Sequence, residues 1–150
     1  MKPSQTLALS ILAVLSFACS LPAPAEDSDK PFAEAHVVLQ LANDDDKTQA
    51  RVLSVANNLI KHYGGPDFVD IEIVSYGPGI SLLYPDNANR ERISSLMAND
   101  VRFVGCQNTL DTIERATGER PELIPDVILV KTGIARVIER AQQDFVVIKP

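Results

Sequence analysis

The sequence predicts an α/β fold, a three-layer α/β/α arrangement around a mostly parallel five-stranded sheet. Short runs of β-branched and other apolar residues alternate along the chain with longer segments in which apolar residues recur at helical spacing. Each short run is read as apolar on both faces, which is typical of strands that helices cover on both sides. Because crossovers between parallel strands are right-handed, only a few topologies are compatible with this order.

Five segments have the composition and length of buried strands. The first, HVVLQLA, is rich in β-branched and apolar residues and is too short for a helix. The third, VRFVG, ends at a cysteine, and the last runs to the final residue of the chain. The predicted strands span residues 36–42, 70–76, 101–105, 127–132 and 144–150.

Four helices are predicted between these strands. The first has Asp46 as its expected N-cap, with Gln49 three residues later as in a capping box. It ends at Gly64-Gly65, because glycine accepts the left-handed conformation at a helix C-terminus. The remaining helices are predicted over residues 86–99 and 108–117 and around residues 134–141.

The first 25 residues have the layout of a secretory signal peptide. Lys2 provides a positive start, residues 7–18 are almost uniformly apolar, and small residues at 23–25 precede Glu26. The apolar run is shorter than the ~20 residues of a membrane-spanning helix, so no stable membrane span is expected. The signal peptide predicts export to the periplasm.

The chain after the signal peptide is expected to be a short leader, residues 26–35, followed by a single domain, residues 36–150. An alternative is a lipoprotein acylated at Cys19. Ala18 fits the motif that directs lipidation, but Ser16 stands where leucine is usual.

Length and charge restrict the class of function. The formal net charge is −6. Loss of the signal peptide would leave 13 basic and 20 acidic residues, a charge of −7, because that segment contains Lys2 and no acid. The remaining length suits one domain with a real core. The negative charge argues against nucleic acids and anionic membranes as partners.

In parallel α/β sheets, ligands and chemistry lie beyond the carboxyl ends of the strands. Polar residues, glycines and a cysteine follow the predicted strands directly. The candidate catalytic residue is Cys106, and the candidate binding residues are Gly77, Gly79, Asn108, Thr109 and Gly133.

Cys106 ends the third predicted strand just before a helix, with Asn108 or Thr109 as the expected N-cap. The helix dipole favours a thiolate there. Its effect at an exposed site, about 0.3–1 kcal/mol, lowers the pKa of the thiol only modestly, since one pKa unit corresponds to about 1.36 kcal/mol. Asp111 and Glu114 on the same helix oppose ionisation. Stronger activation must come from amides around the thiol, or from a basic residue of another loop or subunit.

A packing role for Cys106 is the alternative, since free cysteine is among the most buried residue types. Two observations favour reactivity. The residue lies at the functional edge of the predicted sheet, and an odd cysteine in an exported protein is either reactive or pairs between chains.

Three elements together resemble the DsrE/DsrF-like family, and in particular its branch with Cys-x-Asn-Thr after the third strand. They are VRFVGCQNT at 101–109, the Gly-Pro-Gly turn at 77–79, and the C-terminal pattern of GIARVIERAQ at 133–142 followed by VIKP at 147–150. Their order and spacing cover about residues 34–150, almost the whole predicted domain.

The resemblance implies a sulfur-relay protein, a sulfurtransferase-like carrier that holds sulfane sulfur as a persulfide. Cys106 corresponds to the persulfide-bearing cysteine, whereas Asn108 and Thr109 match the branch motif without a transferable chemical role. The resemblance also implies a homo-oligomer, a trimer or hexamer, with separate sulfur donor and acceptor proteins and no cofactor. The signal peptide and the lack of a neighbouring second cysteine distinguish this chain from the best-known cytoplasmic relays.

The Asp44-Asp45-Asp46 run, Thr132 and Lys149 also match positions of a phosphoryl-accepting receiver domain. Such a domain needs an aspartate where Cys106 stands, so the Asp run is interpreted as a solvated turn that caps a helix. No metal site is expected, because His36 and the other histidine lack partners at ligand spacing.

The apolar segment at residues 80–84 has two interpretations. It is either a loop folded back on the core or, as the resemblance to an oligomeric family favours, a contact between subunits.

Overall fold

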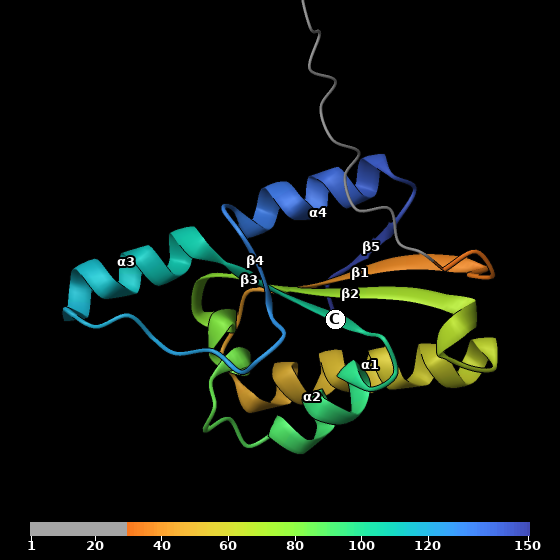
Figure 1. The fold of residues 1–150 in the computed structure, drawn as a ribbon, viewed down its shortest axis with the longest axis horizontal. Coiled ribbons are helices and arrows are strands. Elements are labelled where there is room, and N and C mark those ends of the chain that lie inside the picture. Colours follow the sequence, from red (N-terminus) through yellow and green to blue (C-terminus); the bar gives the residue numbers. More distant parts are fainter. Residues whose placement is uncertain (1–29) are drawn as a thin grey trace, which may run out of the picture.

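The structure is a computed structural model that describes residues 30–150, and the predicted signal peptide lies outside this range. The described chain forms one five-stranded sheet with the order β4-β3-β2-β1-β5, and every strand pair is parallel (Figure 1). This arrangement confirms the predicted fold class. The strands are β1 (Ala35–Leu41), β2 (Val69–Ser75), β3 (Arg102–Cys106), β4 (Ile128–Val130) and β5 (Val146–Ile148).

Helices lie on both sides of the sheet (Figure 1). On one side are α1 (Asp46–Tyr63) and α2 (Arg90–Met97), and α4 (Gly133–Gln142) covers the other side. The remaining helix, α3 (Gln107–Thr117), starts at the end of β3 and projects beyond the carboxyl ends of the strands (Figure 1). Two short 3-10 helices, η1 (Pro66–Phe68) and η2 (Gly77–Leu83), flank β2. Within residues 30–150, no helix is both long and apolar enough to span a bilayer.

Two hydrophobic cores lie on opposite faces of the sheet, because side chains alternate along each strand. Val37 and Leu39 of β1 belong to the larger core, with the apolar faces of α1 and α2. Val38, between them in sequence, belongs to the smaller core with Val137 of α4 and Phe145. The helices of both layers are therefore attached to the same central strands.

The start of α1 differs in detail from the prediction. Asp45, rather than Asp46, is the N-cap, and its carboxylate accepts a hydrogen bond from the Thr48 amide at 2.9 Å. Gln49 does not complete a capping box. It is buried and joins α1 to η2 by donating to Ser81 Oγ at 3.0 Å. The predicted end is confirmed, since Gly64 is left-handed with φ of 85°.

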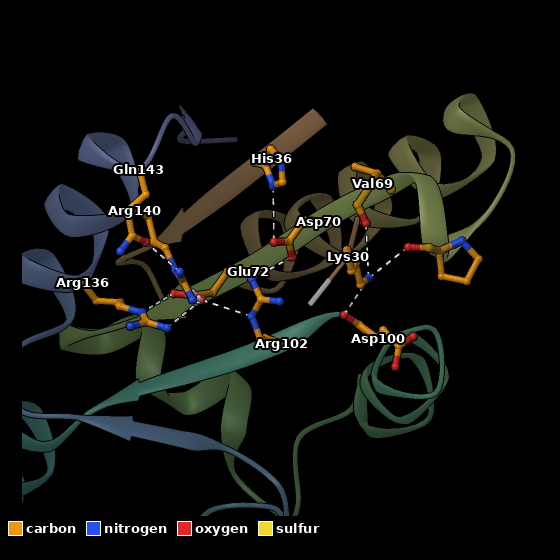
Figure 2. Close-up of polar contacts among 11 residues, drawn as sticks. Lys30, His36, Val69, Asp70, Glu72, Asp100, Arg102, Arg136, Arg140 and Gln143 are labelled. Atoms are coloured by element: carbon orange, nitrogen blue, oxygen red, sulfur yellow. Dashed lines mark hydrogen bonds and ion pairs between the residues drawn. The ribbon is translucent and has the colours of Figure 1, made fainter. Parts of the chain in front are cut away.

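The expectation that each strand is apolar on both faces is wrong for β2 and β5. Asp70 and Glu72 of β2 are fully buried charged residues, and Figure 2 shows arginines gathered around them. At the edge of the sheet, Val146 and Val147 of β5 are 58% and 41% exposed. The first departure has a physical cause, because a carboxylate can be buried when cations compensate it.

The segment after β2 is part of the core rather than a subunit contact. Ile80, Leu82 and Leu83 of η2 are each at most 1% exposed within the single chain. Their burial supports the interpretation of residues 80–84 as a loop folded back on the core. The second predicted helix is also shorter than expected, with α2 restricted to Arg90–Met97.

Gly79 is required by close packing between η2 and the end of β1. A Cβ atom at this position would lie 2.5 Å from the carbonyl oxygen of Leu41 and 3.1 Å from the carbonyl carbon of Ala42. Both atoms belong to the backbone, so neither can move aside like a flexible side chain. The structure thus gives Gly79 a packing role, and its predicted binding role stays a prediction.

We expect Gly79→Ala to lower the free energy of unfolding by about 1–3 kcal/mol, the usual cost of overpacking. Urea denaturation followed by circular dichroism measures this. Ser95→Ala, on the exposed face of α2, is the control and should change stability by less than about 0.5 kcal/mol. Equal unfolding midpoints for Gly79→Ala and the wild type would contradict the packing role.

Candidate functional site

Cys106 is the last residue of β3 and also the N-cap of α3, so the chain passes from strand to helix without a loop. The prediction that Asn108 or Thr109 caps this helix is wrong, because Cys106 itself occupies the N-cap position. The cysteine pairs in register with Val130 of β4 and is only 5% exposed. Its thiol faces the backbone of the neighbouring strand end, with the sulfur 3.9 Å from the carbonyl oxygen of Lys131.

Thr109 connects the cysteine to the turn after β2. Its hydroxyl oxygen accepts a hydrogen bond from the Gly77 amide at 2.9 Å. The same hydroxyl donates to the Cys106 sulfur. Because the Gly77 amide occupies a lone pair of the hydroxyl, the hydroxyl proton is left for the sulfur. Gly77 has φ of 53°, a left-handed conformation that suits glycine and aims its amide at Thr109.

The start of α4 closes the other side of the cysteine. A Cβ atom on Gly133 would lie 3.3 Å from Cys106 Cβ and 3.0 Å from Tyr76 Cβ, so a side chain here would crowd both residues. This close approach brings the Gly133 amide to the Cys106 sulfur as a hydrogen-bond donor. Asn108 joins the two helix starts, since its side-chain amide donates to Thr132 Oγ1 at 3.0 Å.

Burial raises the pKa of the Cys106 thiol, and hydrogen bonds lower it. The groups that lower it are chiefly the Thr109 hydroxyl and the nearby backbone amides of Gly133 and Thr109. The hydrogen bonds prevail, so the pKa is lower than that of an ordinary cysteine. The sequence analysis predicted that stronger activation of the Cys106 thiol needs backbone amides or a basic residue. The structure places backbone amides from the N-termini of α3 and α4 near this thiol.

A groove of about 770 Å³ opens beside the cysteine at the carboxyl edge of the sheet. Its wall combines two tyrosine rings and apolar side chains with the polar groups of α3. Cys106 itself does not line the groove, whereas its sequence neighbours Asn108 and Thr109 do. Residues that line the groove include Tyr76, Gly77, Pro78, Tyr84, Asn108 and Thr109.

The structure thus brings together most of the candidate residues. Asn108, Thr109, Gly77 and Gly133 surround Cys106, whereas Gly79 packs against β1. The sequence analysis missed Tyr76, which touches the Gly133 position, lines the groove and accepts a hydrogen bond from the Gln40 side chain. The position of Tyr76 directly after β2 and next to Gly77 could have indicated from the sequence that it belongs to the site.

The remaining polar candidates have structural roles. Asp45 caps α1, which agrees with interpreting the Asp run as a helix-capping turn. His36 lies 3.5 Å from Asp70, with its Nδ1 facing Oδ2. In the part of the chain that the structure describes, no three His, Cys, Asp or Glu residues are grouped so as to hold a metal ion.

Comparisons with known proteins add support for the fold. No family model and no curated protein matches the sequence. Among solved structures, the chain is similar to MTH1491 from Methanobacterium thermoautotrophicum, which is described as a protein of unknown function. The two superpose with a TM-score of 0.69 at 29% identity, over 78% of this chain and 100% of the archaeal chain. The resemblance to the DsrE/DsrF-like family therefore stays a hypothesis.

We expect Thr109→Val to slow the alkylation of Cys106 by iodoacetamide about three- to tenfold at neutral pH. Without the hydroxyl donor the thiol pKa rises, and less thiolate is present below it. Rates measured from pH 6 to 10, in a Cys19→Ser background with one thiol, give the profile.

Thr109→Ser keeps the hydroxyl and should react like the wild type. Thr112→Val, one turn further along α3, removes a hydroxyl that bonds to the Asn108 carbonyl instead, and should also leave the rate unchanged. If Thr109→Val and Thr112→Val behave alike, the hydroxyl of Thr109 does not stabilise the thiolate.

Proposed function

We propose that this protein is a sulfur carrier that holds sulfane sulfur as a persulfide on Cys106. The observation that supports the proposal best is the convergence of the N-termini of α3 and α4, with the Thr109 hydroxyl, on one sulfur atom. Groups that lower the pKa of Cys106 make it the thiolate that attacks a sulfane donor, and a good leaving group when the outer sulfur is passed on. The resemblance to the DsrE/DsrF-like family points to the same chemistry.

The transfer needs no external oxidant. The Cys106 thiolate attacks the outer sulfur of a donor such as thiosulfate, a new S–S bond forms, and the donor S–S bond breaks to release sulfite. The sulfur moves at the sulfane level, and the charge is conserved between the two anions on each side. An acceptor thiolate then attacks the outer sulfur, and Cys106 leaves as a thiolate.

The limited access to the Cys106 thiol restricts which sulfane-sulfur donors can reach it. Cys106 is 5% exposed, and the groove of about 770 Å³ reaches its neighbours Asn108 and Thr109. A small inorganic donor or an extended side chain suits such a space better than a folded surface.

The proposal also includes the cellular location of the protein and its partner proteins. The signal-peptide pattern of residues 1–25 favours a periplasmic carrier, and the family resemblance favours a trimer or hexamer served by separate donor and acceptor proteins. The exposed side chains of Ile134 and Ile138, 43% and 54% exposed on α4, are compatible with such assembly.

A second candidate function is binding without chemistry, in which Cys106 only packs. The specific observation in its favour is that the groove is lined by Tyr76 and Tyr84 but not by Cys106. In that case the groove would hold a small apolar molecule, and the thiol would take no part.

We expect purified protein incubated with thiosulfate or polysulfide to gain roughly 32 Da per sulfur atom by intact mass spectrometry. With Cys19→Ser as the background, Cys106→Ala should show no adduct, and dithiothreitol should remove the adduct from the protein that keeps Cys106. Thr109→Val should reduce the yield, whereas Thr112→Val should not. Absence of an adduct with every sulfane donor would contradict sulfur carriage and favour the binding function.

A further inference from the structure

The most unusual feature outside the cysteine site is a group of buried charges between β2 and α4, here called the buried ion cluster (Figure 2). Asp70 and Glu72 are both 0% exposed. Arg140 is 2% exposed, and the side chains of Arg102 and Arg136 are 22% and 16% exposed. Three guanidinium groups therefore surround two carboxylates in a place that apolar residues would ordinarily fill.

Glu72 is the centre of this cluster, and most of its bonds go to α4. Arg136 donates from Nε to Oε1 at 2.7 Å and from Nη2 to Oε2 at 3.1 Å, a bidentate pair. Arg140, one turn later on α4, donates from Nε to Oε2 at 3.0 Å. Arg102 of β3 adds a longer contact at 3.3 Å. The Glu72 carboxylate on the central strand thus forms ion pairs with arginines from two successive turns of α4.

Such a cluster is weak evidence for stability on its own, because desolvation of the ions offsets much of their attraction. Its geometric effect is stronger. A bidentate arginine–carboxylate pair fixes both distance and orientation, which apolar side chains do not. Here it fixes how α4 lies on the sheet and where the first turn of α4 sits.

The first turn of α4 is the part that contacts the cysteine. Gly133 lies three residues before Arg136, about 4.5 Å along the helix axis. The Arg136 amide donates to the Thr132 carbonyl at 3.2 Å, which closes this turn. The Arg136 side chain, bonded to Glu72, is therefore attached to the same turn whose Gly133 backbone packs against Cys106.

We infer that Glu72 and Arg136 are positioning residues, which hold the first turn of α4 so that the Gly133 amide points at the Cys106 sulfur. This inference deepens the proposed function, since it assigns the control of that thiol to a cluster on another part of the sheet. Neither residue touches the sulfur, and both act through the placement of one amide.

A simple effect of charge at a distance gives a different expectation. The charged groups of the cluster are Asp70 and Glu72 from β2, Arg102 from β3, and Arg136 and Arg140 from α4. His36 of β1 faces Asp70. Removing the negative charge of Glu72 would, by charge alone, favour the thiolate. Loss of positioning would disfavour it, so the two effects have opposite signs.

The decisive variant is Arg136→Lys, which keeps the charge and loses the bidentate geometry. In the full-length Cys19→Ser protein, we expect iodoacetamide alkylation of Cys106 at neutral pH to slow about three- to tenfold. The plateau rate at high pH should not change. Arg102→Lys is the matched control, because Arg102 contacts the same Glu72 but belongs to β3, and it should leave the rate unaltered.

The Glu72→Gln variant shows whether loss of this carboxylate slows or accelerates the alkylation of Cys106. Positioning predicts slower alkylation at neutral pH, and faster alkylation would overturn the inference in favour of charge alone. Equal effects of Arg136→Lys and Arg102→Lys would also overturn it. If Glu72→Gln does not fold, Arg136→Lys still decides, because its partly exposed side chain keeps a cation in the cluster and circular dichroism can confirm its folding.

This experiment is separate from the test of sulfur carriage, because alkylation reports the thiolate whether or not a persulfide forms. A wild type that takes up no sulfur, with Arg136→Lys still slowing alkylation, would refute the carrier and support the positioning role. If the wild type takes up sulfur and Arg136→Lys is alkylated at the wild-type rate, the sulfur carrier is supported and the positioning role is refuted.

Discussion

The buried carboxylate of Glu72 is the constraint on which the arrangement of this protein depends. It lies at the middle of the central strand β2 with no access to solvent, so it requires cationic donors from the elements packed against it. Arg136 and Arg140 supply them from α4, at distances of 2.7–3.1 Å. The sheet and the helix that covers it are thereby joined by directed bonds as well as by the small core of Val74 and Val137.

The cysteine site is a consequence of parallel topology. Because β3 and β4 are adjacent and run in the same direction, the helices that follow them begin side by side. The first turns of α3 and α4 then lie on either side of Cys106 at the end of β3. The thiol pKa is lowered by neutral donors rather than by a basic side chain, so reactivity depends on the placement of backbone groups.

Burial and reactivity are balanced at this site. Desolvation opposes the thiolate, but the Thr109 hydroxyl and the nearby backbone amides favour it more strongly, so the pKa of the thiol is lowered. The same burial leaves Cys106 only 5% exposed, and the groove of about 770 Å³ is lined by Thr109 but not by Cys106. The site therefore combines a thiol whose pKa is lowered with restricted access to that thiol.

Much of this protein was determined by local sequence. Strand and helix alternation, the left-handed end at Gly64 and the place of Cys106 at a strand end follow from patterns a few residues long. Tertiary structure alone decided the burial of Asp70 and Glu72 and the approach of Gly133 to the sulfur. Glu72 lies 64 residues before Arg136 in the chain, and Cys106 lies 27 residues before Gly133. No local pattern records which distant donor will compensate a buried charge, because that depends on which strands and helices become neighbours.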